Sequence, residues 1–298
     1  MFEKVNPQHP DKVADRVAGA IVDLAYTRAE GGWLNSNPRI AVEVLIGHGH
    51  ATVIIETSLT RSDLNAGDVM DIIKRIVPTL TEQGCTIIIA EQDQFLGQNQ
   101  QNGVRVGDNG IFRGLPMSAE QKRLAQIAKV LYANHPTDGK FIISWDGENQ
   151  GYQAVICQSN IDKPYEEDIR ELLLREFGVL NCNINPLGYW TGGTDVDCGA
   201  TNRKLGSDMG DAVTGGGLHG KDLSKADVSV NIVCHILAKK SDMEVEACTA
   251  IGDTEVVFRY ANGKTDTLDY AAVVEMARMF IHTQYGSFEK FAEWGLIA

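Results

Sequence analysis

The chain has 298 residues, of which 43% are hydrophobic and 22% charged, and its formal net charge is −13. These proportions are typical of a globular protein and exclude a mainly disordered chain. The acidic balance argues against a nucleic-acid-binding or anionic-membrane surface, because long-range attraction to either requires positive charge. The longest apolar runs, such as residues 87–90, are far shorter than the ~20 residues of a membrane span.

The cysteines and the N-terminus both indicate a reducing compartment. The six cysteines have no CxxC or other zinc-binding spacing and stand at Cys85, Cys157, Cys182, Cys198, Cys234 and Cys248. The first residues, Met1 to Lys4, contain an acid, a base and no apolar run, so we see no secretory signal. We therefore expect reduced, mostly buried thiols and a cytoplasmic protein.

The first elements predicted along the chain are a helix, two strands, a second helix and a third strand. Apolar residues recur at helical spacing after Pro10, which suits the first position of a helix. Two alternating strands follow, joined by the turn Gly47-His48-Gly49-His50. The predicted ranges are a helix over 10–24, strands over 39–46 and 51–59, a helix over 62–76 and a strand over 85–90.

The same order of helix, hairpin and helix returns twice. Ser118 and Gln121 form a capping box that opens the second round, and Gly178 ends its last helix. The second round has a hairpin over 140–145 and 152–157 and a helix over 165–177, while the third has a helix over 225–239, strands over 244–249 and 255–260 and a helix over 268–281. Three such rounds predict an α+β fold with antiparallel or mixed sheets.

Two loops stand apart from these rounds. Gln92–Gly107 is rich in Gln, Asn and Gly and has no apolar periodicity, which is typical of an active-site lid and equally of an idle surface loop. Gly188–Gly220 is longer, dense in Gly, Asp and Thr, and too regular in its charges for a linker.

A glycine-rich segment before the third-round helix favours phosphate binding. Gly215, Gly216 and Gly217 allow close approach of the backbone to an anion, and the helix start adds unpaired N–H groups. Lys221 and Lys225 share a face at that end. The spacing nearly matches a P-loop, but an Asp stands where Ser or Thr should bind magnesium, and no apolar strand precedes it. The alternative is a plain glycine-rich turn with solvated lysines.

Polar residues on apolar strands are the next candidates. Glu43 and Glu56 interrupt strands that are apolar on both faces, so each needs a cation or hydrogen-bond donors unless it opens to water at an edge. His48 and His50 lie at a hairpin tip without a third ligand, and we interpret them as exposed turn residues rather than a metal site. The chain has no nucleophile elbow.

Taken in order, four segments resemble S-adenosylmethionine synthetases (methionine adenosyltransferases). They are Gln8–Asp15, similar to G-H-P-D-K-[IV]-[AC]-D; Arg105–Gly110, similar to G-A-G-D-Q-G; Asp197–Lys204, similar to D-C-G-L-T-G-R-K; and Gly215–Asp227, similar to G-G-G-A-F-S-G-K-D-P-S-K-V-D with one residue fewer. Shorter matches near residues 184–186, 250–252 and 285–288 extend the resemblance over nearly the whole chain. The chain is shorter than the family's usual length, so it resembles a minimal member.

The resemblance implies three similar α+β units around a pseudo-threefold axis. The implied units are interleaved: an N-terminal-type unit of residues 1–7 and 119–192, a central-type unit of 8–98 and 193–229, and a C-terminal-type unit of 99–118 and 230–298. It also implies a homodimer or a dimer of dimers, with active sites at the interface.

The implied reaction is attack of the methionine sulfur on C5′ of the ATP ribose, followed by cleavage of tripolyphosphate to pyrophosphate and phosphate. The implied catalytic residues are His9, Lys140, Arg203, Lys221 and Lys225, and ATP would also contact Asp108, Asp138, Tyr189, Trp190, Asp197 and Lys204. Methionine would contact Glu56, Gln98, Asp197 and Lys225. Asp11 and Asp227 would each hold one Mg²⁺, and Glu43 would bind K⁺.

Two other function classes stay open at this point. One is a different phosphate-binding enzyme, kinase-like or a P-loop NTPase, which would hydrolyse ATP without methionine. The other is a non-catalytic relative that binds nucleotide as a regulator. Five residues argue against this second class, because a protein without the activity has no need of them all: His9, Asp11, Lys140, Lys221 and Asp227.

Overall fold

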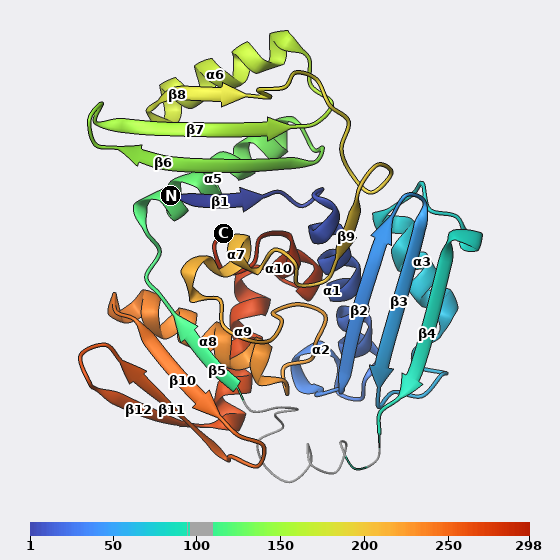
Figure 1. Cartoon of the computed structure of the whole chain (residues 1–298). Helices are drawn as coiled ribbons and strands as arrows, with labels where there is room; N and C mark the ends of the chain where they lie inside the picture. Colours follow the sequence, from blue (N-terminus) through green and yellow to red (C-terminus); the bar gives the residue numbers. More distant parts are fainter. Residues whose placement is uncertain (94, 96–109) are drawn as a thin grey trace.

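The structure is a computed structural model that describes residues 1–93, 95 and 110–298. Most of the expected lid over 92–107 lies outside these residues, and so do Gln98 and Asp108. The described chain forms three four-stranded sheets with helices packed between and behind them (Figure 1).

The first sheet has the strand order β1-β6-β7-β8. Its strands are β1 (Phe2–Val5), β6 (Gly139–Asp146), β7 (Gly151–Gln158) and β8 (Val179–Ile184). One face packs on α5 (Ala119–Asn134) and α6 (Lys163–Phe177), and Phe141 and Ile143 of β6 join Leu124 and Leu131 of α5 in one core cluster. The capping box of Ser118 and Gln121 is present at the start of α5.

The second sheet has the order β4-β3-β2-β9 and faces two helices. Its elements are β2 (Ile40–Gly47), β3 (His50–Thr57), β4 (Cys85–Glu91), β9 (Cys198–Ala200), α1 (Pro10–Arg28) and α3 (Ala66–Ile76). Alternate residues of β2 and β3 are buried in the cluster that also contains Val17 of α1 and Ile73 of α3. The opposite face exposes Leu45 (56%), Ile54 (47%) and Ile88 (48%).

The third sheet has the order β12-β11-β10-β5. Its elements are β5 (Gly110–Gly114), β10 (Val245–Thr249), β11 (Glu255–Tyr260) and β12 (Thr265–Asp269), with α8 (Ala226–Ser241) and α9 (Tyr270–Gln284). Phe112, Phe258 and Val230 lie in its core. The shorter elements of the chain are α2 (Gly32–Asn35), η1 (Glu82–Gly84), α7 (Leu205–Met209), η2 (Gly210–Ala212) and α10 (Phe288–Trp294).

Each sheet takes one edge strand from a distant part of the chain. β1 pairs with β6, β9 with β2, and β5 with β10, all antiparallel. The pairs β3–β4 and β7–β8 are parallel, so two of the sheets are mixed. Each of these edge strands, β1, β9 and β5, pairs with a segment far away in the sequence. These exchanged strands connect the three sheets into one body (Figure 1).

Most expected helices and strands are confirmed within two residues at each end. The helix expected over 10–24 continues to Arg28, and the helix expected over 268–281 continues to Gln284. The helix expected from residue 62 begins at Ala66, because Asn65 accepts from the Asp68 N–H and caps it. The helix expected from residue 268 begins at Tyr270, since Leu268 pairs with Val256 in β12. All six cysteines are free as expected, but only Cys234 is buried. None of the described helices is long and apolar enough to cross a membrane.

Candidate active site

The start of α1 forms the first part of the site. His9 caps the helix, and its Nδ1 accepts a hydrogen bond from the Asp11 N–H at 3.2 Å. Burial and the nearby Lys204 ammonium lower the pKa of His9 to about 4, so the ring is neutral at pH 7. Because Nδ1 is an acceptor here, the ring proton lies on Nε2, which can donate to a ligand.

Asp11 lies at the centre of a cationic cluster, and its side chain is only 2% exposed. Its Oδ2 accepts from Lys204 Nζ at 2.6 Å, and its Oδ1 accepts from the Ala200 N–H at 2.9 Å. Arg203 Nε lies 3.5 Å from Oδ1. A side chain at Gly199 would overlap the backbone of Pro10, so this glycine lets the segment 198–204 pack directly on the start of α1.

The glycine-rich segment 215–221 forms the second part of the site. Lys221 Nζ donates to Asp227 Oδ2 at 2.7 Å, and Lys225 caps α8 without a side-chain hydrogen bond. Gly216 has a φ of +80°, and a Cβ there would lie 2.2 Å from the Asp227 carboxylate. The segment follows η2 rather than a strand, so the strand–loop–helix order of a P-loop is not present here.

A buried charge cluster beneath the site was missed by sequence reasoning. Lys12 Nζ lies 2.6 Å from Asp208 Oδ2 and 3.0 Å from Asp15 Oδ2. Asp208 also pairs with His219 Nε2 at 2.9 Å. Asp15, Asp208 and His219 form the one potential three-ligand metal group among the described residues, but the Lys12 ammonium already supplies a cation there. The cluster therefore joins α1 and α7 to the glycine-rich segment.

Lys12 stays charged in this cluster. Burial opposes the ammonium, but Asp15 and Asp208 outweigh burial and raise its pKa. No periodic pattern in the sequence points to a role for Asp208 or His219. Lys12 and Asp15 belong to the first motif, but no contact was predicted for either of them.

A third group surrounds Asp138, whose side chain is 5% exposed. Its Oδ2 accepts from the Gly193 N–H at 3.1 Å, while Oδ1 has no partner among the described residues. Burial and the charges of Asp197 and Asp11 raise the pKa of Asp138 to about 6. A cavity of about 270 Å³ opens beside it.

Aromatic residues lie next to Asp138. A Cβ on Gly192 would meet both the Trp190 ring at 2.7 Å and Asp138 Oδ2 at 2.8 Å, so the ring and the carboxylate share this small space. Trp190 Nε1 donates to Asn185 Oδ1 at 3.1 Å, which fixes the ring. Tyr189 is exposed.

Lys140 and Asp197 lie close enough to His9 to shift its pKa, Lys140 downward and Asp197 upward. Lys140 Nζ also lies 3.3 Å from Glu3. The structure therefore brings one set of expected site residues around the start of α1: His9, Asp11, Asp138, Lys140, Asp197, Arg203 and Lys204. Lys221, Lys225 and Asp227 form the second group on the glycine-rich segment.

The two glutamates lie on the open face of the second sheet. Glu43 Oε2 accepts from the Thr201 hydroxyl, and Glu56 stands opposite Ala41, which also bridges to Lys221. Neither lies on an edge strand, yet Glu43 is exposed and Glu56 is partly exposed within one chain. His48 and His50 are exposed at their turn, as expected.

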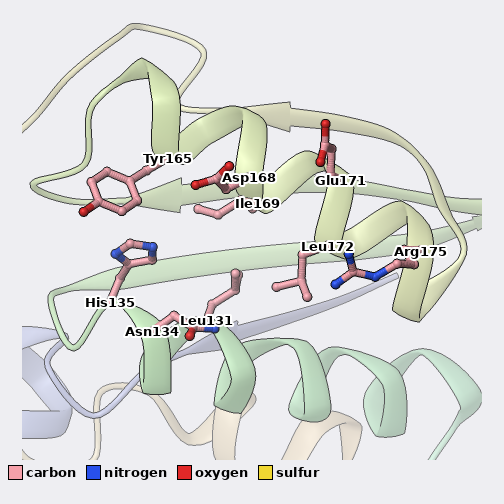
Figure 2. Close-up of a pocket in the computed structure, with 9 residues that line it drawn as sticks. All are labelled: Leu131, Asn134, His135, Tyr165, Asp168, Ile169, Glu171, Leu172 and Arg175. Carbon is pink, nitrogen blue, oxygen red and sulfur yellow. The ribbon is translucent and has the colours of Figure 1, made fainter.

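A larger cavity, of about 410 Å³, lies between α5 and α6 (Figure 2). Leu131, Ile169 and Leu172 line it, and Tyr165 stacks edge-on with His135 at a centroid distance of 4.7 Å. None of the expected site residues that the structure describes lines this cavity, and its charged rim of Asp168, Glu171 and Arg175 has no excess of cations. It is therefore separate from the two groups of expected site residues.

No protein-family model matches this chain. The S-adenosylmethionine synthase of Desulfosudis oleivorans is 29% identical over 314 residues, which cover 86% of this chain and 78% of that protein. The S-adenosylmethionine synthase of Brachyspira hyodysenteriae is 27% identical, with 89% and 78% covered. These relatives confirm the resemblance drawn from the motifs.

Among solved structures, an unusual S-adenosylmethionine synthetase from Campylobacter jejuni has a similar fold. The superposition has a TM-score of 0.72 at 17% identity and covers 99% of this chain and 93% of the other. This likeness confirms the mixed α/β fold.

Proposed function

We propose that this chain is a transferase that forms S-adenosylmethionine from ATP and L-methionine, as its similarity to S-adenosylmethionine synthases indicates. The sulfur attacks C5′ of the ribose and displaces the triphosphate chain, which is then cleaved to pyrophosphate and phosphate. The observation that carries the proposal is the pair of carboxylate–lysine contacts, Asp11 with Lys204 and Asp227 with Lys221, on two segments that present further cations.

The proposed reaction requires little acid–base catalysis, but it requires strong stabilisation of negative charge on the leaving group. A thioether sulfur is a nucleophile without deprotonation, so no general base is needed. Negative charge instead builds on the departing oxygen of the triphosphate. Neutral His9 donates from Nε2 to that oxygen, and Lys140 and Arg203 hold the adjacent phosphates. Charge-assisted hydrogen bonds contribute roughly 1.5–3 kcal/mol each.

The lysines have a second role before the nucleotide binds. Lys204 and Lys221 neutralise Asp11 and Asp227 and hold these carboxylates in place. When ATP enters, each lysine exchanges its carboxylate for phosphate oxygens, which frees the carboxylate. We assign Lys225 to the same phosphate chain, because it is the N-cap residue of α8 and no side chain among the described residues accepts a hydrogen bond from the first N–H groups of this helix.

The donor set fits the proposed metal ions. Mg²⁺ in proteins commonly takes one or two carboxylates together with substrate phosphates and water, and Asp11 and Asp227 each offer one carboxylate beside the phosphate-binding cations. Glu43 and the Thr201 hydroxyl provide oxygen ligands for K⁺. When held by Asp11 and Asp227, Mg²⁺ would supply positive charge beside the phosphate oxygens.

The remaining residues recognise the two substrates. We assign Asp138, Asp197, Asp108 and Lys204 to ATP, with Trp190 or Tyr189 stacking on adenine next to the cavity at Asp138. Glu56, Gln98, Asp197 and Lys225 would bind the methionine amino and carboxylate groups. Gln98 and Asp108 lie outside the described residues.

We also propose a three-unit architecture, a homodimer and a cytoplasmic location. The units are residues 1–7 with 119–192, residues 8–98 with 193–229, and residues 99–118 with 230–298; the exchanged strands β1, β9 and β5 support this division. Similar sheets with paired helices support the pseudo-threefold arrangement. The apolar open face of the second sheet supports a dimer, or a dimer of dimers, in which this face is covered.

The direct test is incubation with ATP, methionine, Mg²⁺ and K⁺, followed by mass spectrometry for S-adenosylmethionine. We expect the product with the wild type and a large loss with Lys221→Met. Lys240→Met, an exposed lysine on the same helix as Asp227, is the matched control and should retain activity. Absence of the product from the wild type at any methionine concentration would contradict the proposal.

A further inference from the structure

Two phosphate-binding segments meet at one side chain that the proposed reaction does not use. Asn202 lies between Thr201 and the Arg203-Lys204 pair, and His219 lies two residues before Lys221. Asn202 Oδ1 accepts from the His219 N–H at 2.9 Å, and Asn202 Nδ2 donates to the His219 carbonyl at 3.1 Å. A single amide thus satisfies both backbone groups of one residue in the glycine-rich segment.

The position of Asn202 is itself tightly fixed. Its own N–H donates to Asp15 Oδ1 at 2.8 Å, which ties it to α1. Its φ of +62° lies in the left-handed region, where Gly and Asn are the residues tolerated best. The related D-C-G-L-T-G-R-K motif has Gly at this place, so the backbone alone does not require Asn.

The middle and end of the glycine-rich segment are also held by other contacts. Leu218 is buried in the core, His219 Nε2 pairs with Asp208, and the Val42 N–H donates to the Gly220 carbonyl at 2.7 Å. At its start, a Cβ on Gly217 would lie 2.5 Å from the Asn202 side chain, so Gly217 packs directly on the amide. The Asn202 amide therefore links the backbone of this segment to the residue next to the Arg203-Lys204 pair.

We propose that Asn202 is a positioning residue that fixes the distance between the two phosphate-binding groups, and so determines the preference for a three-phosphate chain. This inference rests on the proposed function only for its phosphate-binding groups. The Arg203-Lys204 group engages one end of the chain and the Lys221 group engages the other. An anion long enough to contact both groups binds more tightly when their separation is fixed, as any bivalent ligand does. An anion that contacts only one group gains no affinity from the fixed separation.

The test compares two anions that resist hydrolysis, diimidotriphosphate and imidodiphosphate, by calorimetric titration in the presence of Mg²⁺. The variant is Asn202→Gly, since Gly adopts the same backbone and removes only the amide. We expect diimidotriphosphate to bind at least ~10-fold more weakly to the variant and imidodiphosphate to change by less than ~2-fold. Equal losses for the two anions, or no loss for either, would overturn the inference.

A matched control and a second readout separate positioning from a general loss of structure. Asp242→Gly replaces another residue with left-handed backbone, φ +54°, at the end of α8, and should leave both affinities unchanged. Hydrogen exchange at the His219 amide should be faster in Asn202→Gly, because its acceptor is gone. Unchanged protection of that amide would show that Asn202 does not hold the segment, whatever the wild type does with methionine.

Discussion

Asp138 is a buried carboxyl of the candidate site, and its burial opposes its ionisation. Burial and two neighbouring carboxylates raise its pKa to about 6, against an ordinary value of 3.8. The folded protein therefore keeps an additional proton between these pH values, and its stability falls as pH rises through this window. Above pH 6, this pKa shift lowers the free energy of unfolding by roughly 3 kcal/mol relative to its value at low pH.

Replacing this carboxyl should reverse the effect. We expect Asp138→Asn to melt at a higher temperature than the wild type at pH 7.5, with a gap that shrinks toward pH 4, when both are measured without substrates. Asn keeps an oxygen for the Gly193 N–H. Asp71→Asn, at an exposed position on α3, should show no pH-dependent gap. If the difference in melting temperature between Asp138→Asn and the wild type did not change with pH, ionisation of Asp138 would not be its cause.

The two aspartates assigned to magnesium provide a second prediction at this scale. Asp11→Asn and Asp227→Asn should each lower kcat by ~100-fold or more, because an amide is a poor Mg²⁺ ligand and leaves its lysine unpaired. Circular dichroism should show an intact fold. Asp242→Asn, in a left-handed conformation that suits Asn, is the control and should keep full activity. Near-wild-type rates at ordinary Mg²⁺ would disprove the metal role.

At the scale of elements, the buried Lys12 cluster should be the most sensitive ion-pair group of the fold. It joins α1, α7 and the glycine-rich segment, and its side chains are almost fully buried. Lys12→Met leaves two carboxylates buried without their cation, so we expect a loss of about 3–5 kcal/mol in the free energy of unfolding. Lys74→Met, which breaks an exposed pair of the same 2.6 Å length with Glu82, should give no measurable change. Similar losses in denaturant titrations of both variants would contradict this account.

The long helices and hairpins were predictable because their apolar periodicity is local. The strand β9 was not, since Cys198–Ala200 has only three residues and pairs only because Gly199 lets it pack on α1. The short strand β12 was not predicted for a similar reason: it has only five residues, directly before a helical pattern, and its last two residues were assigned to the predicted helix.

The site residues were predictable only as far as motifs name them. His9, Asp11 and Lys221 stand in motifs with recognisable chemistry, and their partners follow from the fold. Asp208 and Asn202 act through contacts between segments far apart in the chain, for which a single sequence holds no signal. The apolar open face of the second sheet was predictable, because the sequence places apolar residues on both faces of its two central strands.

At the scale of the whole molecule, that open face should mediate the dimer. Leu45, Ile54 and Ile88 lie on it, and an exposed apolar sheet is typical of an interface. Ile54→Asp should shift the sedimentation coefficient from dimer to monomer and lower activity. Met279→Asp, at a similarly exposed apolar residue on α9, should leave the dimer intact. An active wild-type monomer at micromolar concentration would disprove the shared-site dimer.

The proposed shared active sites predict complementation. Glu56→Ala and His9→Ala should each be inactive alone, because in the proposed dimer the two residues would serve one site from opposite protomers. Mixing the variants under exchange conditions should restore part of the activity, since some heterodimers then carry one complete site. No recovery despite confirmed subunit exchange would place both residues in the same protomer's site.

Adenosyl transfer to methionine can be measured by following ATP consumption and S-adenosylmethionine formation together in one reaction. We expect ATP loss to depend on methionine and to equal the S-adenosylmethionine formed, with pyrophosphate and phosphate as the other products. ATP loss that proceeds at the same rate without methionine, with ADP as the product, would contradict it and identify a different phosphate-binding enzyme.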